Sequence, residues 1–204
     1  MRYDIEVTFA VQCALFEQAD RRPLGDGAWL DVSSAWLPDG DRLFDELAAT
    51  MPWRAERRPM YDRVVDVPRL VSFHDLRTEP APHPRIAELR DRLNDAYADE
   101  LGEPFTTAGL CLYRDGSDSV AWHGDKIGRG RIEDTMVAIV SLGATRVFAL
   151  RPRGGGTSLR LPQAHGDLLV MGGSCQRTWE HSVPKTSKGC GPRISIQFRP
   201  HDVR

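Results

Sequence analysis

The sequence predicts a mainly β (α+β) protein in which a jelly roll carries helices from the N-terminal part of the chain packed on it. After about residue 105, short apolar runs alternate with glycine and proline, which is typical of antiparallel sandwiches and jelly rolls. Before that point, apolar residues recur every three or four positions, as on the buried face of a helix. At 204 residues, the chain is expected to form a single domain, residues 1–204.

Two helices are expected in the N-terminal part. The first begins at Asp39 or Asp41, and its apolar face consists of Leu43, Phe44, Leu47, Ala48 and Met51. The second begins near Pro84, because proline suits the first helical turn. It is expected to end at Gly102 and Pro104, and its apolar stripe consists of Ile86, Leu89, Leu93, Tyr97 and Leu101. Residues 53–58 and 64–73 are expected to form short strands or extended loops.

Eight strands are expected after residue 105, and each is a short apolar run bounded by turn residues. They cover residues 106–113, 119–123, 135–142, 145–151, 157–161, 167–171, 177–182 and 192–199. The glycine-rich stretch 152–157 resembles a phosphate-binding loop in composition only, because no helix follows it. We therefore expect it to form a hairpin turn.

Composition narrows the classes of protein without selecting one. The net charge of −2 gives no global basic excess of the kind that marks many nucleic-acid-binding proteins, although a local basic face remains possible. The four cysteines form no CxxC pair, so a zinc ribbon is not expected. The N-terminus lacks the pattern of a signal peptide, and no apolar run is long enough to span a bilayer. These features favour a soluble cytoplasmic protein with no membrane association and reduced thiols, and none implies a protein partner.

Three residues have the character of a metal site. Side chains two positions apart on a strand point to the same face, so His123 and Asp125 can reach one ion if that segment is extended. His181 ends a later strand and would complete two histidines and one carboxylate, the ligand set of non-haem Fe(II) oxygenases. An HxD pair alone also occurs by chance, with the histidine at the surface or in the core and the aspartate in a turn.

The last expected strand strengthens the metal interpretation. In residues 193–199 the apolar side chains take the even positions, and Arg193 and Arg199 share the other face. If that face lined the inside of a jelly roll, two buried guanidinium groups would require anionic partners, such as the two ends of a dicarboxylate. If it faced water, the segment would be an ordinary surface strand. Cys111 and Tyr113 likewise share one face, where the phenol could donate to a carboxylate or simply be half-buried.

Three segments then resemble the AlkB family of Fe(II)/2-oxoglutarate-dependent dioxygenases. They are residues 112–151, with LYRDGSDSVAWHGD and VSLGATRVFALR, residues 166–185 and residues 191–199, with GPRISIQFR; residues 67–75 resemble the family more loosely. The resemblance implies a double-stranded β-helix, which is this jelly-roll core, in residues 106–204. It implies that residues 1–105 form a supporting layer and a substrate-recognition lid.

The resemblance also implies residue roles. His123, Asp125 and His181 become the Fe(II) ligands, and Arg193 and Arg199 become the contacts of the cosubstrate 2-oxoglutarate, with Tyr113 assisting. O₂ completes the set of cofactors. The cosubstrate pocket differs from the family's usual pattern, because Cys111 and Ser195 stand where asparagine is usual and Gln197 stands where threonine is usual.

The implied reaction is oxidative demethylation of N-alkylated bases in DNA or RNA, that is, alkylation-damage repair, with release of formaldehyde, succinate and CO₂. A base must be flipped out or presented on a single strand to reach such a site, and an aromatic platform would stack on it. Candidate substrate contacts are Phe73, His74, Trp122, Trp179 and, for phosphate, Arg69. Both tryptophans could instead be core residues. Two other functions remain open. A hydroxylase or demethylase acting on a protein or small molecule stays possible because no acidic pair follows Asp125 and the pI is acidic, and an inactive binding module is the other, although the intact triad and arginines argue against it.

Overall fold

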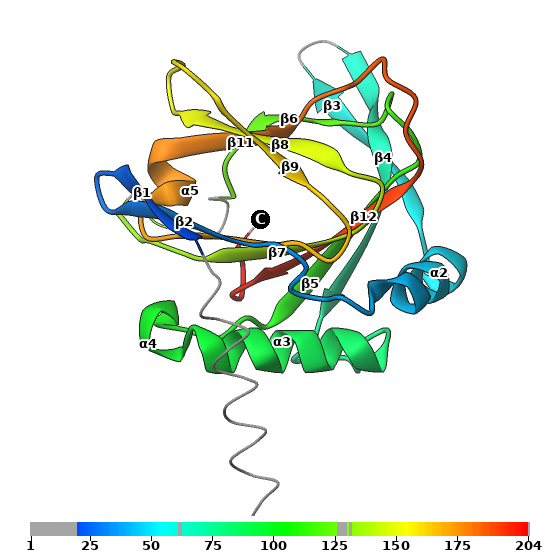
Figure 1. Cartoon of the computed structure of the whole chain (residues 1–204), viewed down its shortest axis with the longest axis horizontal. Helices are drawn as coiled ribbons and strands as arrows, with labels where there is room; N and C mark the ends of the chain where they lie inside the picture. The colour runs from blue at the N-terminus through cyan, green and yellow to red at the C-terminus, as the bar shows by residue number, and fades with distance from the viewer. Residues whose placement is uncertain (1–19, 61–62, 126–129, 131, 204) are drawn as a thin grey trace, which may run out of the picture.

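Two antiparallel β-sheets face each other in the computed structural model, and helices cover the outer side of the larger one (Figure 1). The structure describes residues 20–60, 63–125, 130 and 132–203. The larger sheet has the strand order β1-β2-β10-β7-β12-β5-β4-β3, and the smaller has the order β6-β11-β8-β9. This arrangement confirms the predicted mainly β jelly roll.

The strands of the larger sheet, in its spatial order, are β1 (Asp20–Gly25), β2 (Ala28–Ser33), β10 (Leu168–Gly172), β7 (Val137–Gly143), β12 (Arg193–Arg199), β5 (Thr107–Tyr113), β4 (Arg63–Asp75) and β3 (Arg54–Met60). Those of the smaller sheet are β6 (Val120–His123), β11 (Trp179–Val183), β8 (Arg146–Pro152) and β9 (Leu159–Gln163). The helices are α2 (Gly40–Thr50), α3 (Pro84–Ala96), α4 (Ala98–Leu101) and α5 (Cys175–Thr178).

The larger sheet separates two hydrophobic cores because its side chains alternate between its faces. Ile194, Ile196 and Phe198 of β12 belong to the core shared with α2 and α3. Cys111 and Tyr113 of the neighbouring strand β5 belong to the core between the two sheets. The odd-numbered residues of β12 therefore face inward, as the alternation of the C-terminal strand predicted for a jelly roll.

The predicted strands after residue 105 correspond to β5 through β12, and only their ends differ. The turn predicted at residues 152–157 lies between β8 and β9, where Gly154, Gly155 and Gly156 all have positive φ. Residues 54–58 and 64–73 lie in paired strands, β3 and β4, rather than in loops, and Trp53 precedes β3. Asp39 is the N-cap of α2, although its side chain makes no capping hydrogen bond.

Two N-terminal features differ from expectation. The hairpin of β1 and β2 was not predicted, and its second strand pairs with β10 and so extends the larger sheet. The helix expected to continue to Leu101 ends at Ala96, and a separate short helix, α4, follows. Tyr97 stands at this break, and its hydroxyl lies 3.2 Å from the buried carboxylate of Asp31 in β2. A tertiary hydrogen bond thus interrupts a stripe whose apolar spacing alone suggested one helix.

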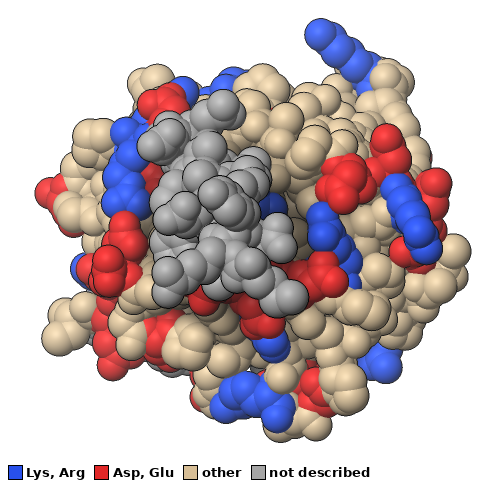
Figure 2. Space-filling view, turned by 60° about the horizontal axis from the view of Figure 1, so that its bottom comes forward, with Lys and Arg blue, Asp and Glu red and all other residues tan. Residues whose placement is uncertain are grey.

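The helix-covered side of the molecule shows no separation of charge by sign. Lysine, arginine, aspartate and glutamate are interspersed there, in the part that is not drawn in grey (Figure 2). Among the described residues, no helix is long and apolar enough to cross a membrane.

Phe198→Ala should lower the free energy of unfolding by about 3–5 kcal/mol, because it removes a fully buried ring from the core under β12. Phe73→Ala is the matched control, since that ring is 49% exposed and its removal should cost about 1 kcal/mol or less. Urea denaturation measures both values. Equal losses would contradict the assignment of Phe198 to the helix-facing core.

Candidate metal centre

Strand pairing brings the two candidate histidines together. In the smaller sheet, His181 of β11 is paired with His123 of β6, and Val183 is paired with Val120. β6 has two residues between these positions and β11 has one, so β6 carries a bulge. The extra residue allows both histidines and both valines to share the inner face of the sheet. Asp125 follows two residues after His123, just beyond the end of the strand.

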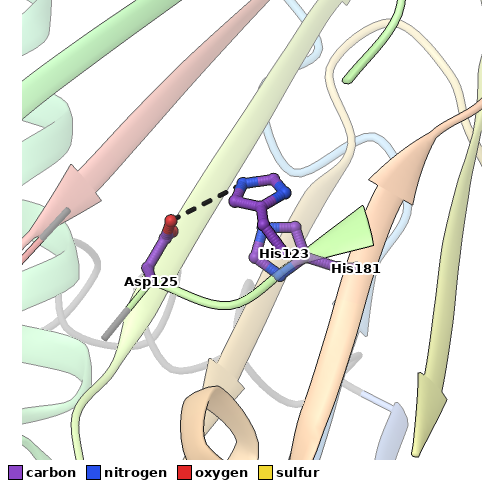
Figure 3. Close-up of side chains that lie close together, drawn as sticks. All are labelled: His123, Asp125 and His181. Carbon is purple, nitrogen blue, oxygen red and sulfur yellow. Dashed lines mark ion pairs between the residues drawn. The ribbon is translucent and has the colours of Figure 1, made fainter. Parts of the chain in front are cut away.

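The three side chains are close enough to hold one ion. Their candidate ligand atoms all lie within 4.8 Å of one another, and Asp125 Oδ1 is 3.7 Å from His123 Nε2 (Figure 3). Donor atoms that share a first-row divalent ion at about 2.1 Å are about 3–4 Å apart. Asp125 and His181 are buried and His123 is partly exposed, so the ion's site would open on the side of His123.

Neighbouring groups orient two of these ligands. His123 Nδ1 lies 2.8 Å from the carbonyl oxygen of Ala121 and donates to it, which leaves the lone pair of Nε2 for an ion. Asp125 Oδ2 accepts from Arg199 Nε at 2.9 Å and forms an ion pair with Arg199 Nη2 at 2.8 Å, which leaves Oδ1 on the side of His123. The backbone N–H of Asp125 donates to Gln176 Oε1 at 2.9 Å.

Electrostatics keep Asp125 and His181 in their metal-binding protonation states. Burial by itself raises the pKa of Asp125, but the charges of Arg199, His181 and His123 and the hydrogen bond from Arg199 hold it well below its usual range. Burial lowers the pKa of His181 to about 3, assisted by His123. Because a metal requires an ionised carboxylate and a neutral imidazole, neither ligand must lose a proton at neutral pH.

Arg193 is the buried cation whose partners are incomplete. It is 1% exposed, and its Nη2 donates to Ser141 Oγ at 2.9 Å. Its Nε and Nη1 are buried and have no hydrogen-bond partner among the described residues. The ring of Tyr113 lies 5.2 Å from the guanidinium, and burial raises the pKa of this phenol to about 12, so the ring supplies no anion. Unsatisfied donors on a buried guanidinium fit a carboxylate ligand.

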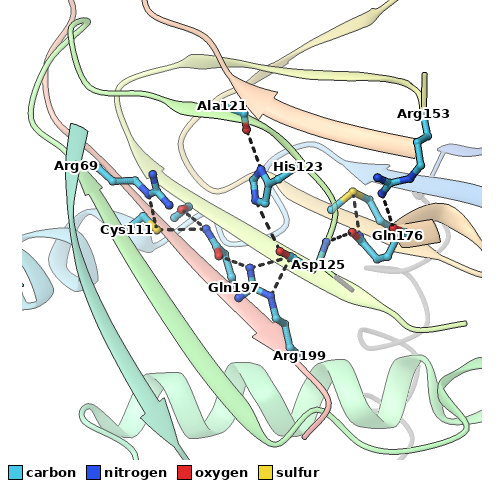
Figure 4. Close-up of polar contacts among 11 residues, drawn as sticks. Arg69, Cys111, Ala121, His123, Asp125, Arg153, Gln176, Gln197 and Arg199 are labelled. Carbon is cyan, nitrogen blue, oxygen red and sulfur yellow. Dashed lines mark hydrogen bonds and ion pairs between the residues drawn. The ribbon is translucent and has the colours of Figure 1, made fainter. Parts of the chain in front are cut away.

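The positions at which the chain departs from the usual AlkB pattern form one polar chain. Gln197 Nε2 donates to Ser195 Oγ at 3.1 Å and to Cys111 Sγ at 3.5 Å, and Gln197 Oε1 accepts from Arg199 Nη2 at 2.6 Å (Figure 4). Arg69 Nε donates to the same sulfur at 3.4 Å. Gln197 therefore supports the guanidinium that holds Asp125, while Cys111 and Ser195 support Gln197.

The predicted substrate contacts separate into two groups. Phe73 is paired with Gly109 and lies on the inner face of β4, together with Arg69 near Cys111. His74 alternates to the opposite face, where it contacts Ser72 and Glu79, so the structure does not bring it together with the triad.

The two tryptophans lie on opposite faces of the smaller sheet. Trp122 lies under the guanidinium of Arg151, which pairs with Glu180 on the outer face of the smaller sheet. Trp122 is adjacent to the inward-facing His123 and therefore points to the opposite face of β6, so the structure does not place it beside the triad either. Trp179 packs against the core between the sheets, which is the alternative that the sequence left open.

Three contributors to the site were not predicted. Gln176 and Ser141 lie in segments that resemble the family, but the sequence assigned them no role, and only the fold brings them to Asp125 and Arg193. Gly124 has a spatial role, because a Cβ there would lie 2.7 Å from the carbonyl oxygen of Gln176. The glycine between the two ligands of HGD was the one available signal.

The model of the 2OG-Fe(II) oxygenase superfamily matches residues 38–199, which include the triad and both inward arginines. The chain belongs to this superfamily. It is 31% identical over 185 residues to the alpha-ketoglutarate-dependent dioxygenase alkB homolog 3 of Bos taurus, a match covering 80% of this chain and 62% of that protein. It is 35% identical over 127 residues to the DNA oxidative demethylase ALKBH2 of Homo sapiens, covering 58% and 48% of the two chains.

These relatives are AlkB homologues, and the chain spans about 62% of the length of the alkB homolog 3 proteins. The cofactors of this domain are therefore Fe(II), 2-oxoglutarate and O₂, and its enzyme class is that of the Fe(II)/2-oxoglutarate-dependent dioxygenases. The His-Asp-His cluster and the incomplete partners of Arg193 fit the metal and the dicarboxylate.

Solved structures confirm the double-stranded β-helix. OsALKBH1 has a TM-score of 0.63 at 17% identity, covering 89% of this chain and 100% of that chain. A prolyl hydroxylase from Trichoplax adhaerens has a TM-score of 0.62 at 11% identity, covering 99% and 94%. At these identities the likeness concerns the fold alone.

The stability of chelator-treated protein should decrease as the pH falls from about 6.5. An unfolded chain protonates His181 near pH 6.5, whereas the folded chain keeps it neutral to about 3, so this group contributes a decrease of at most about 1.4 kcal/mol per pH unit. Asp125 affects the stability only at lower pH, because its contribution to the free energy of unfolding is lost as the pH falls below about 4.

Urea denaturation at roughly pH 7 and pH 5 measures this dependence. His181→Gln is the comparison, and its stability should decrease less over the same interval. The pKa of His74 is also lowered by burial, but it contributes to both proteins and cancels in their difference. Identical pH dependence in the two proteins would show that His181 is not kept neutral by the fold.

Proposed function

We propose that this chain catalyses oxidative demethylation of N-alkylated bases in DNA or RNA. The observation that carries the proposal is a His-Asp-His cluster with two buried members, in the same interior as a buried arginine with two unpartnered nitrogens, in a chain of the 2OG-Fe(II) oxygenase superfamily. One relative at 35% identity is named a DNA oxidative demethylase, which supports the choice of substrate.

His123, Asp125 and His181 hold Fe(II) in this proposal, and three facing ligands leave positions open for cosubstrate and O₂. With these bound, the centre supplies the oxidation of the N-methyl carbon, which leaves as formaldehyde while 2-oxoglutarate becomes succinate and CO₂. The protein orients the reactants and excludes water.

Arg193 binds one carboxylate of 2-oxoglutarate through Nε and Nη1, while Ser141 fixes the third nitrogen. Arg199 orients Asp125 and lies at the metal end of the cosubstrate, and Gln197 supports it. Tyr113 forms an uncharged wall beside Arg193. Arg193 thus binds the carboxylate far from the metal, and Arg199 holds the metal ligand Asp125.

A base enters from the exposed side of the inner face. Phe73 is the aromatic candidate that combines an inner-face position with exposure, at 49%, and stacking on an aromatic ring contributes roughly 1–3 kcal/mol per base. The partly buried Arg69, with its bonds to Cys111 and to the carbonyl of Ser119, fits the pocket wall better than a phosphate contact. The basic residues 126, 129 and 131 lie outside the described residues.

Arg193→Met should raise the dissociation constant of 2-oxoglutarate by about 30-fold or more, because losing one partner of a buried charge pair costs about 2 kcal/mol or more. Calorimetric titration of 2-oxoglutarate into anaerobic Mn(II)-loaded protein measures it. Arg160→Met, which changes an exposed arginine of β9, is the control and should bind as the wild type does. Unchanged affinity in Arg193→Met would remove Arg193 from the cosubstrate site.

A panel of methylated DNA and RNA oligonucleotides tests the substrate class. Formaldehyde and the unmodified base should appear in equal amounts with Fe(II) and 2-oxoglutarate, and Asp125→Ala should release neither. Succinate formation that no oligonucleotide stimulates would overturn the nucleic-acid substrate and favour a protein or small molecule instead.

A further inference from the structure

The one-turn helix α5 connects β10 to β11 and lies against the turn that carries Asp125. Its Gln176 is 2% exposed, and its side chain is directed at that turn (Figure 4). Three positions after α5 ends, β11 supplies His181. A short rigid element therefore touches one candidate ligand and leads directly to another.

The contact between Gln176 and the turn gives the backbone N–H of Asp125 a hydrogen-bond acceptor that no neighbouring strand supplies. Asp125 lies beyond the end of β6, so its N–H has no strand partner, and a buried N–H without an acceptor is costly. Gln176 Oε1 accepts this N–H at 2.9 Å. Gln176 Nε2 lies 3.5 Å from Met171 Sδ in β10, which fixes the orientation of the amide.

The backbone of the same turn is pressed against α5. A Cβ on Gly124 would lie 2.7 Å from the carbonyl oxygen of Gln176 and 3.3 Å from that of Trp179, so glycine alone fits this approach. Arg153 contacts α5 beside this approach, with Nε donating to the carbonyl of Arg177 at 2.7 Å and Nη2 donating to that of Gln176 at 3.3 Å, and the same Cβ would lie 2.8 Å from Nη2.

We propose that Gln176 is a positioning residue that sets the geometry of Asp125 relative to His181 for metal binding. It contacts the peptide of Asp125 and not the ion, and α5 transmits the position of β11 to the ligand turn. This inference rests on the proposed metal-binding role of the triad.

A pair of variants separates positioning from packing. Gln176→Met keeps the length of the side chain but removes the acceptor, whereas Gln176→Glu keeps an acceptor oxygen whether it is ionised or protonated. Gln163→Met makes the same change at a buried glutamine of β9 and is the matched control. Mn(II) alone is titrated into each protein, and free Mn(II) is followed by its EPR signal.

Gln176→Met should raise the dissociation constant of Mn(II) by about 10-fold or more, as is usual for groups that orient a ligand. Gln176→Glu should stay within about threefold of the wild type, and Gln163→Met should match it. Wild-type affinity in Gln176→Met, or equal losses in the methionine and glutamate variants, would overturn the proposal.

Two further proteins complete the test. Asp125→Ala should lose Mn(II) binding. If Asp125→Ala binds Mn(II) as the wild type does, the triad is not the metal site. If Asp125→Ala loses binding while Gln176→Met keeps wild-type affinity, only the positioning role of Gln176 is rejected. If Gln176→Met does not fold, Gly124→Ala displaces the same turn from α5. Gly124→Ala should weaken Mn(II) binding about 10-fold, and unaltered binding would equally reject the role of α5.

Discussion

The buried ion pair between Arg199 and Asp125 organises the site. Both side chains are almost fully withdrawn from water, with the guanidinium 2.8 Å from the carboxylate. Removing such charges from water is costly, and each offsets the cost of the other only in a fixed geometry. The pair ties β12, the centre of the larger sheet, to the turn after β6 in the smaller sheet. It uses one oxygen of Asp125, so the second is free on the side of the histidines.

The other inward arginine, Arg193, has no such carboxylate partner among the described residues. Arg193 is nevertheless more deeply buried than Arg199. The strand therefore carries one cation that the protein neutralises itself and one that is left for a ligand. This asymmetry explains why a strand with two buried charges can be both a structural support and a binding surface. It also assigns different tasks to two arginines that sequence alternation treats as equivalent.

Much of the fold and of the metal site could be predicted from the sequence, because both depend on the alternation of side chains along single strands. The alternation of residues 193–199 placed Ile196 and Arg193 on opposite faces, and the HxD spacing placed two ligands together. Features that depend on tertiary contact could not be predicted. One is the break between α3 and α4 at Tyr97, whose hydroxyl bonds to Asp31 66 positions away, and another is the bulge that aligns Val120 of β6 with Val183 of β11. Gln176 has no local signal because its partner is 51 positions away.

A crystal structure of the protein with Mn(II) and 2-oxoglutarate, grown without oxygen, tests the central claim most directly. The account predicts one ion held by His123 Nε2, Asp125 Oδ1 and His181, with the far carboxylate of the cosubstrate on Arg193 Nε and Nη1. An ion bound without Asp125, or a cosubstrate that leaves Arg193 without an anionic partner, would contradict it.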